Sequence, residues 1–178
     1  MEQYVFYIGQ ALGVVAVILG FINYQVKTRE QVLIVNGVTT VCFVLHYICL
    51  GAWAGMAVNA VASIRNVVFY FAGKTGKVSR AWAVFFVLVM GTIGTTTSLL
   101  AGEKWYFILS VAGLMINSFA MSFSNPNSIR KSILVTSPMV LVYNGLVLSF
   151  GGMVYEAVAI VSAMIGILRV KKSTPATP

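Results

Sequence analysis

Seven apolar segments, each close to twenty residues long, take up almost the whole sequence and constrain its fold more than any other feature. A helix that crosses the hydrocarbon core of a bilayer needs about 20 mostly apolar residues. Only 9% of the residues are charged, whereas a soluble domain typically has about 25%. Most of the surface must therefore face lipid. The expected helices cover residues 5–25, 32–50, 54–72, 81–100, 105–124, 131–149 and 152–170.

The cations are placed asymmetrically between these segments. With seven spans, ten of the twelve lysines and arginines fall on one side. Short cytoplasmic loops are rich in Lys and Arg, so we expect a periplasmic or extracellular N-terminus and a cytoplasmic C-terminus. The net charge of +8 then indicates topology and contact with anionic lipid headgroups, and not nucleic-acid binding. That side carries Lys27, Arg29, Lys74, Lys77, Arg80, Arg130, Lys131, Arg169, Lys171 and Lys172, and the other carries Lys104 beside Glu103 and Glu2.

An internal repeat relates the two ends of the chain. The stretch "HYICLGAWAGMAVNAVASI" at 46–64 aligns with "YNGLVLSFGGMVYEAVAIV" at 143–161. Two three-helix units joined by a single helix have the same orientation and are related by an axis along the membrane normal. The expected units are a first repeat at 1–73, a linker helix with its loops at 74–103, a second repeat at 104–170 and a disordered cytoplasmic tail at 171–178.

This plan of three, one and three helices resembles the SWEET sugar transporters and the wider PQ-loop group, which includes the KDEL receptor. The first helix of each repeat in that group typically ends in a Pro-Gln pair. Here the corresponding places hold Tyr24-Gln25 and Asn125-Pro126-Asn127, so the motif is incomplete in both repeats.

A closer resemblance extends over nearly the full length. The segments "NAVASIRN", "YNGLVLSFGGMVYEA" and "ILR" are similar to the YgjV-type bacterial inner-membrane proteins. This resemblance implies a multi-pass protein of the bacterial inner membrane, and it implies no particular activity.

Arg65 and Glu156 are the two charges that fall well inside the expected spans. An ionisable group at the centre of a membrane helix costs about 2.5–3.5 kcal/mol on insertion scales, so such groups face the bundle interior. Arg65 is therefore a candidate to bind an anionic group of a solute, or to pair with Glu156 in one state of a transport cycle. The alternatives are a permanent structural ion pair or an arginine that snorkels along its stem.

A polar stripe runs along the same helix as Arg65. Asn59, Ser63, Asn66 and Tyr70 share one helical face. They would line a hydrated path, or would hydrogen-bond neighbouring helices as ordinary membrane packing contacts.

Cys42, His46 and Cys49 also share one helical face. A stable metal site needs about four ligands, and no further partner is visible, so we expect no metal. The reference pKa of histidine is close to physiological pH, which makes His46 a candidate proton relay, although a buried, hydrogen-bonded histidine is the simpler interpretation. No catalytic motif, paired acids or nucleotide-binding loop is present, so we expect neither an enzyme nor a cofactor.

These observations predict an all-α integral membrane protein with seven transmembrane helices in two parallel three-helix repeats. The predicted function is a secondary transporter or facilitator that moves a small polar or anionic solute by alternating access. The alternative is a membrane receptor or scaffold of the same architecture. The expected partners are lipids and the solute, and a homo-oligomer is compatible with the sequence. The candidate solute-binding residues are Arg65, Asn59, Asn66, Asn144, Tyr143 and Tyr70, and the candidate proton-coupling residues are Glu156 and His46.

Overall fold

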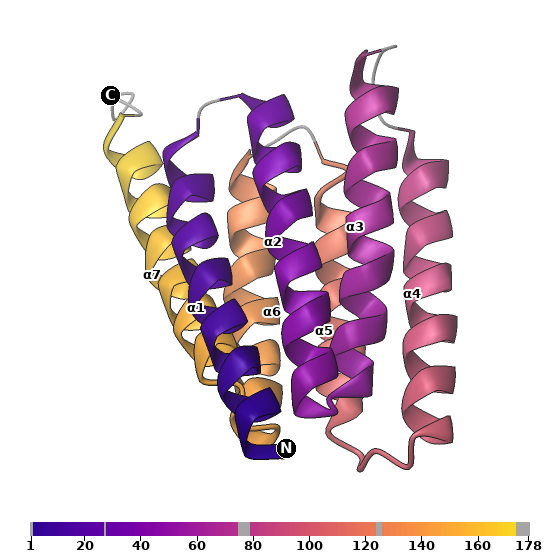
Figure 1. Ribbon diagram of the computed structural model, residues 1–178. Coiled ribbons are helices and arrows are strands. Elements are labelled where there is room, and N and C mark those ends of the chain that lie inside the picture. The colour runs from indigo at the N-terminus through magenta and orange to yellow at the C-terminus, as the bar shows by residue number, and fades with distance from the viewer. Residues whose placement is uncertain (1, 27, 75–78, 124–125, 174–178) are drawn as a thin grey trace.

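The computed structural model describes residues 2–26, 28–74, 79–123 and 126–173, and these form seven α-helices (Figure 1). The expected all-helical fold is confirmed, and each expected segment corresponds to one helix. The helices are α1 (Glu2–Gln25), α2 (Arg29–Leu50), α3 (Trp53–Lys74), α4 (Arg80–Leu100), α5 (Phe107–Ala120), α6 (Pro126–Leu146) and α7 (Phe150–Ser173).

Five of the helices, α1, α2, α3, α4 and α7, are long and apolar enough to cross a membrane. α5 has 14 residues, but a tight turn extends it at each end. Phe107 donates its N–H to the carbonyl of Lys104 at 3.1 Å, and Phe123 donates to Ala120 at 3.0 Å. α6 has 21 residues and carries Pro138 and several hydroxyl side chains, which lower its hydropathy. Both helices lie alongside the longer ones (Figure 1).

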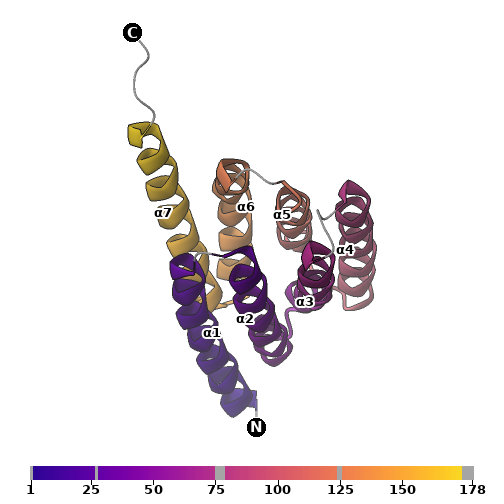
Figure 2. The ribbon, with the colours of Figure 1, turned by 90° about the horizontal axis from the view of Figure 1, so that it is seen from above.

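The helices form two rows that face each other. Seen from above, α1, α2 and α3 form one row, and α7, α6 and α5 form the other (Figure 2). Contacts between α1 and α7 and between α3 and α5 join the rows into a ring, and α4 packs outside it against α3 and α5. In this ring α3 lies diagonally opposite α7. α3 is the most enclosed of the five long apolar helices, with 56% of its apolar window buried.

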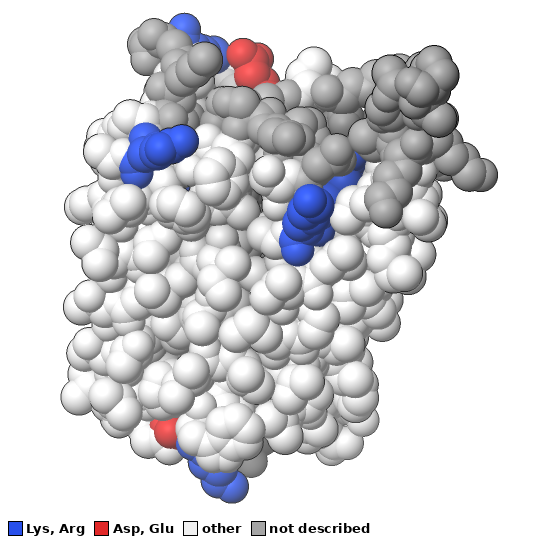
Figure 3. Space-filling view, turned by 180° about the vertical axis from the view of Figure 1, so that it is seen from behind, with Lys and Arg blue, Asp and Glu red and all other residues white. Residues whose placement is uncertain are grey.

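The two ends of the bundle differ in charge. The last residues of α1, α3, α5 and α7 and the first residues of α2, α4 and α6 lie at one end, which we call the basic end (Figure 1). The described cations Lys74, Arg80, Arg130 and Lys131 belong to helix termini at this end. The opposite end carries Lys104 beside Glu103. Between the two ends lies a broad belt of uncharged side chains (Figure 3). Lys27 and Lys77 lie outside the described residues.

The α2–α3 and α6–α7 turns have the same backbone structure. Gly51 and Leu148 occupy equivalent places and both adopt the left-handed conformation, with φ of 65° and 55°. The residue after each bonds five residues back: Ala52 N–H to the Tyr47 carbonyl at 3.0 Å, and Ser149 N–H to the Asn144 carbonyl at 2.8 Å. The left-handed region favours glycine. Leu148 adopts it because the geometry of the turn requires a positive φ at this position.

Glycines bring α1 and α7 into backbone contact near the opposite end. A Cβ added to Gly151 would lie 2.5 Å from the Cα of Gly13. A Cβ on Gly13 would in turn lie 3.0 Å from the His46 ring. Small residues at a membrane helix interface permit this close approach.

We therefore predict that Gly151→Ala lowers the apparent melting temperature of the protein in detergent. The added methyl group cannot fit without moving α1, and overpacking of this kind costs about 1–3 kcal/mol. Gly145→Ala is the matched control, because a Cβ at Gly145 meets nothing within 4 Å. Equal melting temperatures for the two variants, measured by circular dichroism, would contradict the close α1–α7 contact.

Candidate functional site: a polar cavity between the two rows

A cavity of about 350 Å³ lies between the two rows of helices. It extends from Tyr47 and Asn59 in the interior to residues at the basic end, among them Val26 at the end of α1 and Ile129 near the start of α6. Its polar lining contains four asparagines, four Ser or Thr hydroxyls, two arginines and one glutamate. These residues are Asn23, Asn36, Asn59, Asn117, Thr39, Thr40, Thr136, Ser137, Arg65, Arg130 and Glu156.

The faces of α2 and α6 that line the cavity are built alike. On α2 the polar pair is Thr39-Thr40, and at the equivalent place on α6 it is Thr136-Ser137. All four are buried. Thr39 donates its hydroxyl to the Val35 carbonyl of its own helix at 2.8 Å. Hydroxyls that can bond their own backbone are tolerated inside a membrane and still offer oxygen atoms to a solute.

Arg65 projects from α3 and is 2% exposed. Its guanidinium donates one hydrogen bond to the Ser118 hydroxyl on α5 and another to Asn66 Oδ1 at 2.9 Å. Its Nε is buried and has no hydrogen-bond partner among the described residues. The Phe69 ring lies 6.0 Å from the guanidinium carbon. Amide and hydroxyl groups thus hold the cation in place without neutralising it.

Glu156 reaches the cavity from α7, on the other side of the ring. It is partly exposed, and Ser137 of α6 is its hydrogen-bonding neighbour. The permanent Arg65–Glu156 ion pair that the sequence allowed does not form, because the two residues come from diagonally opposite helices. Within the described ranges neither residue takes part in an ion pair, and both line the cavity, as Arg130 of α6 also does.

Hydrogen bonds between the rows close the opposite end of the bundle. His46 is fully buried, with Nδ1 2.6 Å from the Gly9 carbonyl and Nε2 2.6 Å from the Ser149 hydroxyl. A carbonyl oxygen can only accept, so Nδ1 donates, and in the neutral ring Nε2 accepts from Ser149. Both ring nitrogens are therefore occupied. The candidate role of His46 as a proton relay would require these contacts to break.

Two tyrosines complete this closed end. Tyr47 donates its hydroxyl to Asn144 Oδ1 at 2.6 Å, and the Gly55 N–H donates to the Tyr143 hydroxyl at 2.9 Å. Tyr143 and Asn144, at 0% and 1% exposure, are candidate solute-binding residues from the sequence. The structure places both in the closure beneath the cavity, and Tyr47 alone of this group lines the cavity itself.

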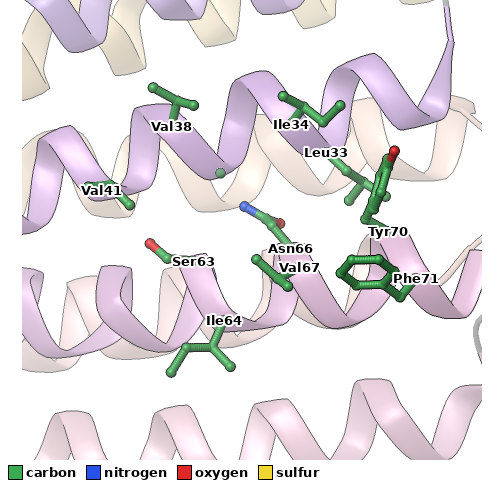
Figure 4. A pocket seen from close by; sticks show the side chains of 11 residues that line it. Leu33, Ile34, Val38, Val41, Ser63, Ile64, Asn66, Val67, Tyr70 and Phe71 are labelled. Carbon is green, nitrogen blue, oxygen red and sulfur yellow. The ribbon is translucent and has the colours of Figure 1, made fainter.

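The polar stripe of α3 divides between two different hollows. Asn59 faces the central cavity and donates to its own helix at the Gly55 carbonyl at 2.8 Å. Asn66 and Tyr70 instead line an outer groove of about 490 Å³ between α2 and α3, whose remaining walls are almost entirely apolar (Figure 4). Many of those walls are exposed on the belt that faces lipid, as Ile64 and Phe71 are. Asn66 remains linked to the cavity through its bond to Arg65.

Several residues that line the cavity were not predicted from the sequence. Asn36, Thr39, Thr40 and Tyr47 recur at helical spacing on one face of α2, and the cavity collects all of them. The signal that would have found them is the match of Thr39-Thr40 with Thr136-Ser137 once the repeats are aligned. Each residue alone is uninformative, because Thr and Ser are frequent in membrane helices.

Comparison with protein families gives one match. Residues 7–174 match the Imp-YgjV family model, described as bacterial inner membrane protein. No curated protein and no solved structure matches the chain. The match covers nearly the whole sequence, so the family resemblance expected from the sequence motifs is confirmed.

We predict that the cavity is reached by water from the basic end. With Cys42 and Cys49 replaced by alanine, Asn36→Cys and Asn59→Cys should react with a small charged thiol reagent added on that side of sealed vesicles. Ser149→Cys is the control and should stay unreactive from both sides, because Ser149 is 0% exposed. The measurement is the fraction of protein labelled. Labelling of position 59 from the opposite side alone would contradict the prediction.

Proposed function

Since the chain belongs to the Imp-YgjV family of bacterial inner membrane proteins, we propose that it is a secondary transporter or facilitator of a small polar solute bearing negative charge. The solute would occupy the central cavity between the two helix rows. About 350 Å³ is within the range of small-molecule sites.

One observation carries this proposal: Arg65 is buried, lines the cavity and has no carboxylate partner among the described residues. Burial of a charge in lipid is expensive, and buried charges are normally paired. An anionic group that enters the cavity would supply the missing partner and accept from the unbonded Nε–H. A purely structural arginine would be expected to have its donors satisfied within the protein.

The internal symmetry supports alternating access by rocking of one row against the other. The α2–α3 and α6–α7 turns share their hydrogen bonds, and the threonine faces of α2 and α6 are equivalent. Tyr47 and Asn144 occupy equivalent places in the two repeats, so their bond lies on the expected axis. Parallel repeats around a midplane site are one recurrent transporter design.

The arrangement favours a state that is accessible from the cytoplasm. The cavity reaches the basic end, while His46, Tyr47 and Tyr143 tie the rows together at the opposite end. Lys- and Arg-rich ends typically face the cytoplasm, so we propose that the N-terminus lies in the periplasm. Breaking the hydrogen bonds between the rows at the closed end would open the cavity to the periplasmic side. A receptor would bind the same solute without this second state.

We predict that purified protein in liposomes carries out uptake of at least one solute in a panel of small radiolabelled carboxylates, phosphates and amino acids. Arg65→Gln should lower the initial rate about tenfold or more, since hydrogen bonds to a charged group contribute about 1.5–3 kcal/mol. Arg65→Lys should retain partial activity, because it keeps the charge and loses the planar fork.

Arg80→Gln provides the matched control. Arg80 is exposed at the start of α4, outside the ring, and should leave the rate unchanged. Binding of a solute without any flux would favour the receptor alternative. Full uptake by Arg65→Gln would show that the solute site has been assigned incorrectly.

A further inference from the structure

Several residues that line the cavity occupy equivalent places in the two repeats, but they differ in charge. Asn59 on α3 occupies the place that Glu156 occupies on α7, and Ala62 likewise corresponds to Ala159. All four line the cavity. Arg65 corresponds to Ser162. Deep in the cavity, α3 of the first repeat therefore supplies a cation and α7 of the second supplies a carboxylate. Arg130 of α6 adds a second cation at the basic end.

The two charges lie on diagonally opposite walls and at different depths. Position 156 is equivalent to position 59, which is six residues before Arg65 on a parallel helix. Six residues of α-helix rise roughly 9 Å, so Arg65 lies nearer the basic end and Glu156 nearer the closed end. The structure places no counter-charge beside either of them within its described ranges. A single solute that satisfies both must therefore be extended and must carry both signs of charge.

We infer that the solute is a small zwitterion, with its anionic group bound by Arg65 and its ammonium group bound by Glu156. The inference rests on the proposed function of this cavity and specifies its substrate class. An anion without an ammonium group would satisfy Arg65 and leave the Glu156 carboxylate without a partner. A zwitterion neutralises both side chains at once, which matters in a low-dielectric site where each unpaired charge is costly.

The rest of the lining suits such a molecule. Asn36 of α2 and Asn117 of α5 line the cavity with their amide side chains. Thr40 of α2 and Ser137 of α6 line it with hydroxyl groups. Amides and hydroxyls can donate or accept, so they can hydrogen-bond either end of a zwitterion as it passes. Phe43, Tyr47 and Tyr155 also line the cavity and belong to one hydrophobic cluster.

The inference is tested by binding, which does not require transport. Isothermal titration of the full-length protein in detergent would use a ladder of zwitterions: glycine, β-alanine, 4-aminobutyrate and 5-aminopentanoate. Each member is compared with its N-acetyl form, which keeps only the negative charge, and with its amide, which keeps only the positive charge. We expect one chain length to bind at least tenfold more tightly than both of its modified forms.

The variants separate the two contacts. Glu156→Gln should weaken the best zwitterion about tenfold and leave its N-acetyl form unchanged, whereas Arg65→Gln and Arg65→Lys should weaken both of these ligands. Arg80→Gln should change neither, and melting temperatures establish that each variant is folded. Equal binding of a zwitterion and its N-acetyl form, or no binding by any member of the ladder, would overturn the inference.

Flux measurements distinguish this inference from the function on which it rests. Zwitterion binding that depends on Glu156, without uptake into liposomes, would overturn transport and leave the ligand class intact. Uptake of a simple anion at an equal rate by the native protein and Glu156→Gln would support transport and overturn the zwitterion.

Discussion

The exclusion of water from the bilayer is the constraint on which the rest of this structure depends. Polar groups in lipid must find partners inside the protein, so most hydroxyls, amides and charges of the membrane helices turn toward the interior. The ring of six helices meets this demand, because every helix contributes one face to a shared centre. The same constraint leaves the outer belt apolar and restricts most cations to the helix ends.

The closed end shows how polar side chains hold the two rows together. His46 joins α1, α2 and the α6–α7 turn through two hydrogen bonds, and Tyr47 crosses between the rows to Asn144. Glu103 also accepts from the Ala54 N–H at 3.1 Å and so covers the start of α3. Hydrogen bonds between membrane helices are individually modest, often near 1 kcal/mol. A set of them can fix one state and still be exchanged for another.

Arg65 differs from these residues because its site is incomplete. Its contacts to Ser118 and Asn66 orient the guanidinium, yet they supply no negative charge. Glu156 across the cavity is incomplete in the same way. The hydrogen bonds at the closed end thus account for the architecture, and the two unpaired charges account for the proposed chemistry.

Much of the fold was predictable because lipid imposes a simple rule on composition. The number of helices, their approximate bounds and the family all followed from apolar length and short motifs. The site was predicted only in part. Arg65, Asn59 and Glu156 were expected to face the interior and do line the cavity. Asn66 and Tyr70 share a stripe with Asn59, but they turn to the outer groove, because α3 is packed on several sides.

The sequence by itself determined the membrane environment, the seven helices and the presence of two costly charges within them. Local composition suffices for these properties, since each depends on the transfer of one segment into lipid. Only the tertiary structure decided that Arg65 and Glu156 face one cavity without pairing, and that Tyr143, Asn144 and His46 belong to its closure. Those outcomes depend on which helices become neighbours, and hydropathy does not encode the order of helices around a ring.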